Sequence, residues 1–165
     1  MPIYYNHLRA ARPCNEYYGQ GRSYRDIPAR PMYPFGYGLS YTDFEIGGID
    51  SDKDILSLSQ LKNGESFKIS VNVKNIGDTD GKETVQLYIK DEVSSVVRPL
   101  RELKGYKKIF VKAGETVNVE FGIGFEELSF YNAKLEKTAE PGKFTVYVGN
   151  DCTTNNVVKT VCIVS

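Results

Sequence analysis

The stretch Phe67-Lys68-Ile69-Ser70-Val71-Asn72-Val73-Lys74 decides the fold, because its apolar side chains fall on every second residue. In an extended strand this period of two places all the apolar side chains on one face of a sheet and the polar ones on the other. The stretch therefore predicts a strand with one buried face. No stretch after residue 44 keeps a period of 3.6, so we expect no helix longer than a turn or two.

The same alternation returns along the rest of the chain. Further strands are predicted at residues 85–90, 117–123 and 144–148, and a last strand at 157–164 is apolar on both faces. Turn-forming residues separate them at 75–81, 112–115 and 140–143. In the last of these, Pro141 presets its own φ and Gly142 is expected to take the positive φ of a type II turn. The short connections predict antiparallel pairing.

Strands with one apolar face each need a second sheet to cover them. Seven or so strands in about 120 residues predict an all-β fold of two antiparallel sheets packed face to face, as in immunoglobulin and fibronectin type III domains. A barrel is the alternative. The chain has no tryptophan and its cysteines lack the paired spacing of antibody domains, so a fibronectin type III-like sandwich fits better.

Composition limits the partners of the chain. With 165 residues, there is room for one ordinary domain or for one domain with an arm. Lys and Arg number 21 and so do Asp and Glu, and this zero net charge disfavours nucleic acids and anionic membranes as partners. The sequence has no apolar run near the about 18 residues of a membrane-spanning helix.

Residues 1–43 differ in composition from residues 44–165. They contain most of the prolines and tyrosines, and all their basic residues are arginine. Arginine and tyrosine are enriched in protein contacts, and the prolines prevent regular structure, so we predict an extended arm that docks on another folded body. A disordered linker is the alternative. Phe35, Tyr37 and Leu39 are expected to pack on the end of the first strand. The predicted docking residues are Tyr4, Tyr5, Arg12, Tyr17, Tyr18, Arg22, Tyr24, Arg25, Tyr33, Phe35 and Tyr37.

Few residues suit metal or nucleophilic chemistry. The three cysteines, Cys14, Cys152 and Cys162, are interpreted as free thiols, and His7 is the only histidine. These features favour a reducing, bacterial-type cytoplasm. Residues 50–54 begin like a calcium loop but lack its glycine and its final glutamate. We predict no catalytic residue, no metal and no cofactor.

Other candidate sites have simpler structural interpretations. Glu83 and Glu120 are expected on the solvated outer faces of strands, whereas four more glutamates fall in or beside turns: Glu115, Glu126, Glu127 and Glu140. Gly36 and Gly38 lack the strand and the Lys-Ser/Thr pair of a phosphate loop, and are interpreted as a turn packed by rings. Tyr88 and Tyr147 are the candidates for a sugar-binding platform, but fit ordinary outer-face tyrosines as well.

One ordered set of motifs resembles a known family. Residues 33–44, with the sequence YPFGYGLSYTDF, resemble the segment that leads into the C-terminal fibronectin type III-like domain of glycoside hydrolase family 3, the β-glucosidases and β-xylosidases. Further matching motifs follow in order and spacing over nearly the whole chain: residues 3–7, 73–77, 80–81, 85–89, 94–99, 101–106, 128–131 and 140–142. A tryptophan that the family often has after residue 131 is missing.

The resemblance implies a role that the residues alone do not supply. In that family both catalytic carboxylates lie in two preceding domains, so none can be assigned to a position of this sequence. The resemblance implies a non-catalytic accessory domain of a retaining β-glycosidase, a β-glucosidase or β-xylosidase, that packs on the catalytic domains through its arm. The alternatives are a separate sugar-binding or adhesive module, and a small intact glycosidase, which would need paired acids in a cleft.

Overall fold

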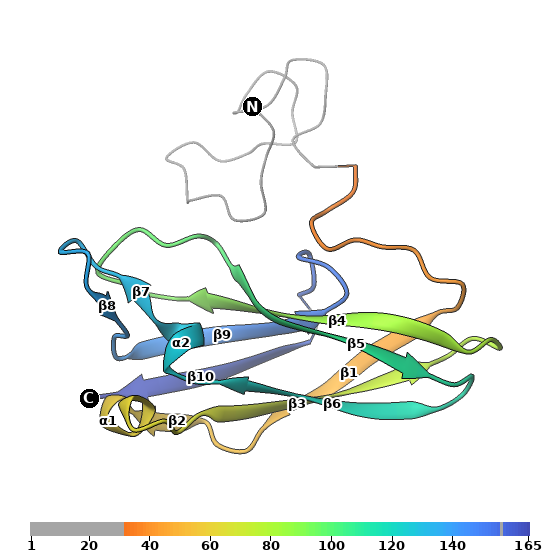
Figure 1. The fold of residues 1–165 in the computed structure, drawn as a ribbon, viewed down its shortest axis with the longest axis horizontal. Coiled ribbons are helices and arrows are strands. Elements are labelled where there is room, and N and C mark those ends of the chain that lie inside the picture. Colours follow the sequence, from red (N-terminus) through yellow and green to blue (C-terminus); the bar gives the residue numbers. More distant parts are fainter. Residues whose placement is uncertain (1–31, 156) are drawn as a thin grey trace, which may run out of the picture.

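The computed structural model describes residues 32–155 and 157–165, which form a two-layered β-sandwich (Figure 1). Seven long strands in these residues build the layers: β1 (Phe44–Ser51), β3 (Phe67–Asn75), β4 (Gly81–Asp91), β5 (Glu102–Val111), β6 (Thr116–Ile123), β9 (Gly142–Gly149) and β10 (Val158–Val164). The short elements are β2 (Ile55–Ser57), α1 (Leu58–Lys62), α2 (Phe125–Leu128), β7 (Phe130–Tyr131) and β8 (Lys137–Thr138). The predicted all-β sandwich with very short helices is confirmed.

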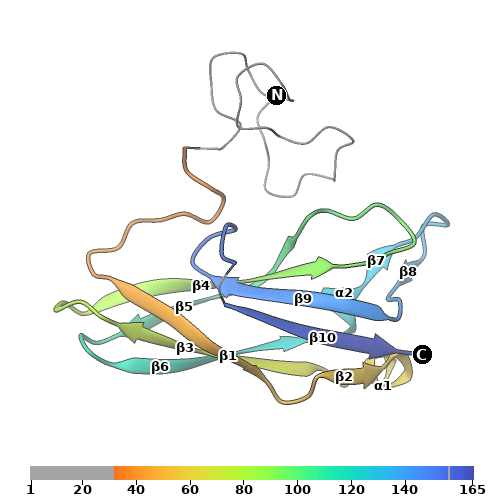
Figure 2. The same ribbon diagram turned by 180° about the vertical axis from the view of Figure 1, so that it is seen from behind.

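The two layers are a three-stranded sheet, β1-β3-β6, and a five-stranded sheet, β2-β10-β9-β4-β5 (Figures 1 and 2). Their long strands pair antiparallel, as expected, whereas β2 runs parallel to β10. A separate hairpin, β7-β8, lies at one end of the sandwich. The apolar residues of the opening stretch, Phe67, Ile69, Val71 and Val73, are all fully buried, so the predicted face of β3 is the core face.

Besides β1, whose register shifts between Gly47 and Asp50, β5 is a long strand that alternation does not reveal. It is the edge strand of the five-stranded sheet, and its register against β4 shifts between Leu87 and Tyr88. Leu87 lies opposite Gly105 and Tyr88 opposite Leu103, so β5 holds one extra residue there. A bulge of this kind reverses the in-and-out order of the side chains along the strand.

The turns follow the sequence with one correction. Gly114 has a positive φ of 75° in the turn at 112–115, which the Glu115 amide closes by donating to the Lys112 carbonyl at 2.9 Å. Gly142 is already part of β9 and is not among the glycines with positive φ, so the prediction of a type II turn there is wrong. Pairing with β10 extends β9 to this glycine, opposite Ile163.

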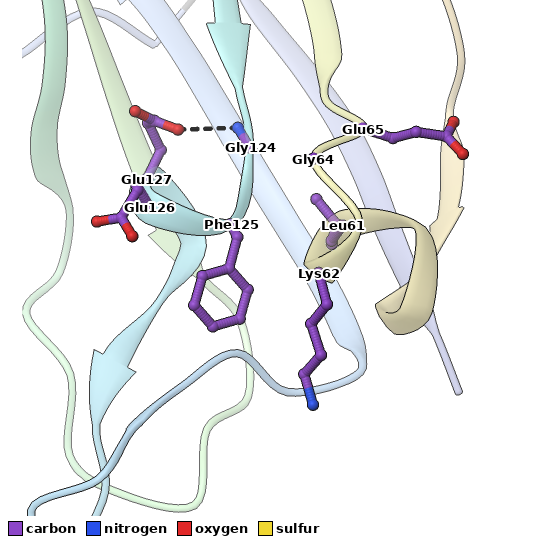
Figure 3. Close-up of a pocket in the computed structure, with 8 residues that line it drawn as sticks. All are labelled: Leu61, Lys62, Gly64, Glu65, Gly124, Phe125, Glu126 and Glu127. Carbon is purple, nitrogen blue, oxygen red and sulfur yellow. Dashed lines mark hydrogen bonds between the residues drawn. The ribbon is translucent and has the colours of Figure 1, made fainter.

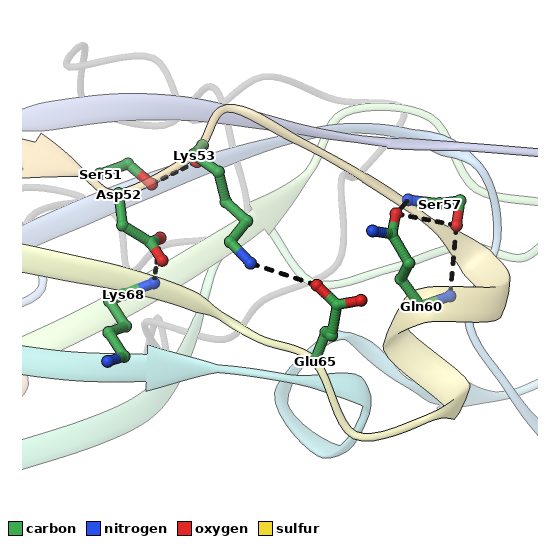
Figure 4. Close-up of polar contacts among 7 residues, drawn as sticks. All are labelled: Ser51, Asp52, Lys53, Ser57, Gln60, Glu65 and Lys68. Atoms are coloured by element: carbon green, nitrogen blue, oxygen red, sulfur yellow. Dashed lines mark hydrogen bonds and ion pairs between the residues drawn. The ribbon is translucent and has the colours of Figure 1, made fainter.

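Residues 51–54 carry the chain from one sheet to the other (Figure 4). The Asp52 carboxylate accepts a hydrogen bond from the Lys68 amide at 2.7 Å, and the Asp52 amide donates to the Lys68 carbonyl at 3.1 Å. Ser57 then caps α1 by accepting from the Gln60 amide. The switch places β1 in the three-stranded sheet and β2 in the five-stranded one.

Candidate docking surface

The segment before β1, residues 32–43, is called the linker here, and it crosses the outer face of the five-stranded sheet (Figures 1 and 2). The Phe35 carbonyl accepts a hydrogen bond from the Cys152 amide, and the Gly36 carbonyl accepts one from Nε2 of Gln86, each at 2.9 Å. At its other end Thr42 donates to the buried amide oxygen of Asn75 at 2.8 Å. The linker is thus attached to the sandwich at two points.

Gln86 of β4 is the centre of the first attachment. Its Nε2 also donates to the Asn150 carbonyl at 2.6 Å, and its Oε1 accepts from the Tyr88 hydroxyl at 2.6 Å. Gln86 is 5% exposed and Tyr88 0%. Buried polar groups are costly unless they are hydrogen-bonded, so this network fixes the covering linker in place.

Gly36 is required by this geometry. Its φ is +84°, a region that other residues rarely adopt. A Cβ atom at this position would lie 2.1 Å from Oε1 of Gln86, well inside van der Waals contact. The interpretation of Gly36 as part of a turn holds, since the Tyr37 amide donates to the Pro34 carbonyl at 3.1 Å.

Arg101 holds the loop that receives the linker. Its Nη1 donates to the carbonyls of Cys152 and Thr154, both at 2.8 Å, and its Nη2 donates to Oδ1 of Asn155 at 2.9 Å. The guanidinium carbon lies 4.1 Å from the centroid of the Tyr147 ring, which adds a cation–π contact. Arg101 therefore fixes the 150–155 loop, whose Cys152 amide binds the linker.

Three of these side chains also had roles considered from sequence. Tyr88 and Tyr147 lie on the outer face of the sheet, as predicted, but Tyr88 is buried and the Tyr147 ring packs against Arg101. They therefore do not form an open row of rings. Burial raises the pKa of the Cys152 thiol, which keeps it protonated at neutral pH.

The linker turns apolar side chains to the solvent. Tyr33, Phe35 and Tyr37 are 63%, 43% and 46% exposed, and the rings of Tyr33 and Tyr37 lie 5.3 Å apart. Leu39 is 89% exposed, so the expectation that it packs on the end of the first strand is wrong; Phe35 instead binds at the 150–155 loop. The remaining predicted docking residues lie outside the described residues: Tyr4, Tyr5, Arg12, Tyr17, Tyr18, Arg22, Tyr24 and Arg25.

Most of the glutamates singled out from the sequence have local partners. A surface pocket of about 410 Å³ gathers Glu65, Glu126 and Glu127, but Glu65 points away from the other two (Figure 3). Glu127 accepts from the Gly124 amide at 2.8 Å and Glu126 pairs with Lys137. Glu115 accepts from the Lys112 amide and Glu140 from Ser95. Glu65 therefore does not face Glu126 or Glu127 across this pocket as the paired acids of a glycosidase would.

The structure corrects the prediction that Glu83 lies on the outer face. Glu120 lies exposed on β6 as expected, but Glu83 shares the core-side face of β4 with Val85 and lies opposite Ile109 of β5. Burial raises the pKa of Glu83, partly offset by a hydrogen bond from the Thr84 amide. The alternation itself puts Glu83 in phase with Val85 and Leu87 on the core face. The prediction of an outer position followed the polar character of the side chain and was wrong.

The acidic residues 50–54 stabilise the crossing between the sheets. Lys159 of β10 pairs with Asp50 at 3.5 Å and with Asp54 at 3.0 Å. The Ser51 amide and Lys159 lower the pKa of Asp50, and the hydrogen bond to Asp54 raises that of Lys159. Within residues 32–155 and 157–165 no group of three or more His, Cys, Asp or Glu side chains is arranged to hold a metal ion. No helix in the same residues is long and apolar enough to cross a membrane.

Sequence reasoning found the linker aromatics but missed the residues that receive them. The motifs that contain Gln86 and Arg101 predict no role for either side chain, because the partners of both lie some fifty residues away in sequence. The sequence does hold one signal for Gln86, because it lies between the core residues Val85 and Leu87. Its side chain must therefore face the outer side of the sheet, where a buried amide needs hydrogen-bond partners.

Comparison with known proteins agrees with this architecture. Residues 83–152 match the family of fibronectin type III-like domains. A periplasmic β-glucosidase of Salmonella typhimurium is 40% identical over 92% of this chain and 19% of its own length. A β-xylosidase of Formosa agariphila is 44% identical over 81% of this chain and 18% of its own.

Solved structures give the same result. A β-glucosidase of Listeria innocua in complex with gluconolactone superposes with a TM-score of 0.85 and 42% identity, covering 100% of this chain and 22% of that one. The GH3 β-glucosidase of Bifidobacterium adolescentis has a TM-score of 0.70 and 33% identity, covering 79% and 18%. The chain thus contains a fibronectin type III-like domain. It is homologous to about a fifth of the length of glycoside hydrolase family 3 β-glucosidases and β-xylosidases, as its motifs indicated.

Proposed function

We propose that this chain is the non-catalytic accessory domain of a retaining β-glycosidase, in the first place a β-glucosidase. Its function is to pack on the catalytic domains of the longer protein and to stabilise them. The substrate of that protein is a β-linked glucoside or xyloside. The observation that carries the proposal is the linker, which is bound to the outer face of the sheet and presents exposed Tyr33, Phe35 and Tyr37.

Two further observations support an accessory role. Glu115, Glu126 and Glu127 are used in local caps and ion pairs, which does not favour them as the acid and nucleophile of a hydrolysis. The relatives that share this segment are β-glycosidases about five times longer than the matched part. We accordingly divide the chain into an arm, residues 1–43, and a sandwich, residues 44–165, and β1 begins at Phe44.

The test compares the chain with the complete product of its gene. Both are assayed on aryl β-glucosides and β-xylosides at matched concentration. We expect turnover by the complete product and none above the buffer rate by the chain. Activity of the chain that is lost on mutation of one of its own Asp or Glu residues would contradict the proposal, as would a complete product with no further domain.

A further inference from the structure

A second apolar surface lies beside the linker on the edge strand β5. Tyr106, Lys108 and Phe110 alternate along β5 and lie opposite Gln86, Thr84 and Lys82 of β4 on the outer face of the sheet. Tyr106 is 69% and Phe110 51% exposed. We call Tyr106, Lys108, Phe110 and Lys82 the β5 rim. A groove of about 430 Å³ separates the linker from this part of the sheet and is lined by Tyr37 and Leu39 on one side and Tyr106 and Lys108 on the other.

The charges of the rim are uncompensated. Neither Lys82 nor Lys108 forms an ion pair with any residue in the part of the chain that the structure describes, whereas Lys53, Lys90 and Lys159 do. The rings of Tyr106 and Phe110 form an apolar centre. The ammonium groups of Lys82 and Lys108 give it a basic border. Protein interfaces have an apolar, aromatic centre and a polar border, so the rim fits a surface that is apolar and acidic.

The path of the linker indicates where that surface belongs. The chain enters the sandwich across the same sheet face, bound at Gln86, which lies directly opposite Tyr106. The described linker is therefore bound directly beside the rim. A neutral glucoside would leave both ammonium groups without carboxylates, so a protein surface satisfies the rim more completely than a sugar does.

We infer that the β5 rim is a second contact of the interdomain interface and binds an apolar, acidic surface on the catalytic part of the same protein. This inference rests on the proposed accessory function and adds to it the partner chemistry and the residues of the sandwich itself. The linker and the rim then form one continuous interface, with the groove between them filled by a partner side chain.

Substitutions on the rim test the inference in the complete enzyme. Tyr106→Ser and Lys108→Glu should each lower its melting temperature by a few degrees and leave kcat on an aryl glucoside at low temperature unchanged. The melting temperature of the chain alone should not change, because both side chains are exposed there. Tyr131→Ser and Lys134→Glu are matched controls in and beside the β7-β8 hairpin, where Tyr131 is 65% exposed. If the controls destabilise the complete enzyme as much as the rim variants do, the inference is wrong.

Hydroxyl-radical footprinting separates this inference from the proposed function. We expect labelling of Tyr106 to fall several-fold in the complete enzyme relative to the chain alone, with Tyr131 unchanged. Protection of Tyr33 and Tyr37 without Tyr106 would overturn the rim inference and leave the accessory function standing. Equal labelling of all three tyrosines in both proteins would overturn both. Protection of Tyr106 in the chain alone by a soluble β-glucan oligosaccharide, or by raising the chain concentration, would assign the rim to a sugar or to a second copy and overturn the inference.

Discussion

The two faces of β4 are built on different principles. On the core face Val85, Leu87 and Ile89 pack against the other sheet, and any well-fitting apolar side chain can serve there. On the outer face Gln86 and Tyr88 are equally buried, but through a defined set of hydrogen bonds to the linker and to the 150–155 loop. The core face thus stabilises the fold, whereas the outer face specifies how one segment lies on it.

The difference separates stability from attachment. A change on the core face should unfold the whole domain, since all strands share that core. A change in the outer network should release the linker or the loop at a smaller cost and leave the sandwich folded.

Val71→Asp should unfold the domain. Val71 is fully buried on the core face of β3, and an unpaired carboxylate there costs several kcal/mol. Circular dichroism and urea denaturation would show the loss. Asn72→Asp places the same carboxylate one residue further on, where the residue is exposed and keeps its bond from Asn118, so it should stay folded. A folded Val71→Asp protein would mean that the faces of β3 are reversed.

Arg101→Ala should destabilise the chain by about 2–4 kcal/mol, because three charge-assisted hydrogen bonds and the contact with Tyr147 are lost together. Arg101→Lys should recover only part of this, since an ammonium cannot reproduce the planar fork. Urea unfolding gives the free energies. Lys108→Ala serves as the exposed control. If Lys replaces Arg101 without loss, the loop does not depend on the guanidinium geometry.

Gly36→Ala should cost about 1–2 kcal/mol, through the positive φ and the clash with Gln86. Release of the linker limits the cost, and amide exchange at Cys152 should accelerate because its acceptor is the Phe35 carbonyl. Gly38→Ala is the control, as no atom lies within 4 Å of the added Cβ. Unchanged exchange at Cys152 in Gly36→Ala would show that the linker is held by other contacts.

Glu83→Gln should have the smallest effect, a gain of roughly half a kcal/mol or less at pH 7, because solvent screens the half-buried group. Burial raises the folded-state pKa of Glu83 above its ordinary value of 4.5, so the wild-type domain loses stability as the pH rises through that window. The gain should vanish below pH 4.5, where the carboxyl is protonated in both states. Urea titrations at pH 7 and pH 4 check it; a gain that persists at pH 4 would rule out desolvation as the cause.

A structural feature can be predicted from the sequence when the interactions that cause it lie among neighbouring residues. The strands around Val71, Val119 and Val146 were predicted because a period of two is a local signal of one buried face. β5 escaped because its bulge and its edge position erase that period. Composition pointed to the linker residues Tyr33, Phe35 and Tyr37. It did not point to Gln86 or Arg101, because the contacts that bind the linker to the sheet join residues distant in sequence. Gly142 shows that a Pro-Gly pair forms a turn only where strand pairing does not include the glycine, and here Gly142 pairs with Ile163 of β10.

The switch of the chain between β1 and β2 also bears on synthesis of the protein. Ile55 of β2 pairs with Cys162 of β10, more than a hundred residues later, and β10 lies between β2 and β9. The five-stranded sheet therefore cannot close until residues 158–164 have left the ribosome, although the β1-β3, β3-β6 and β4-β5 pairs can form before that event. During translation β2 therefore has no strand partner until β10 has been made.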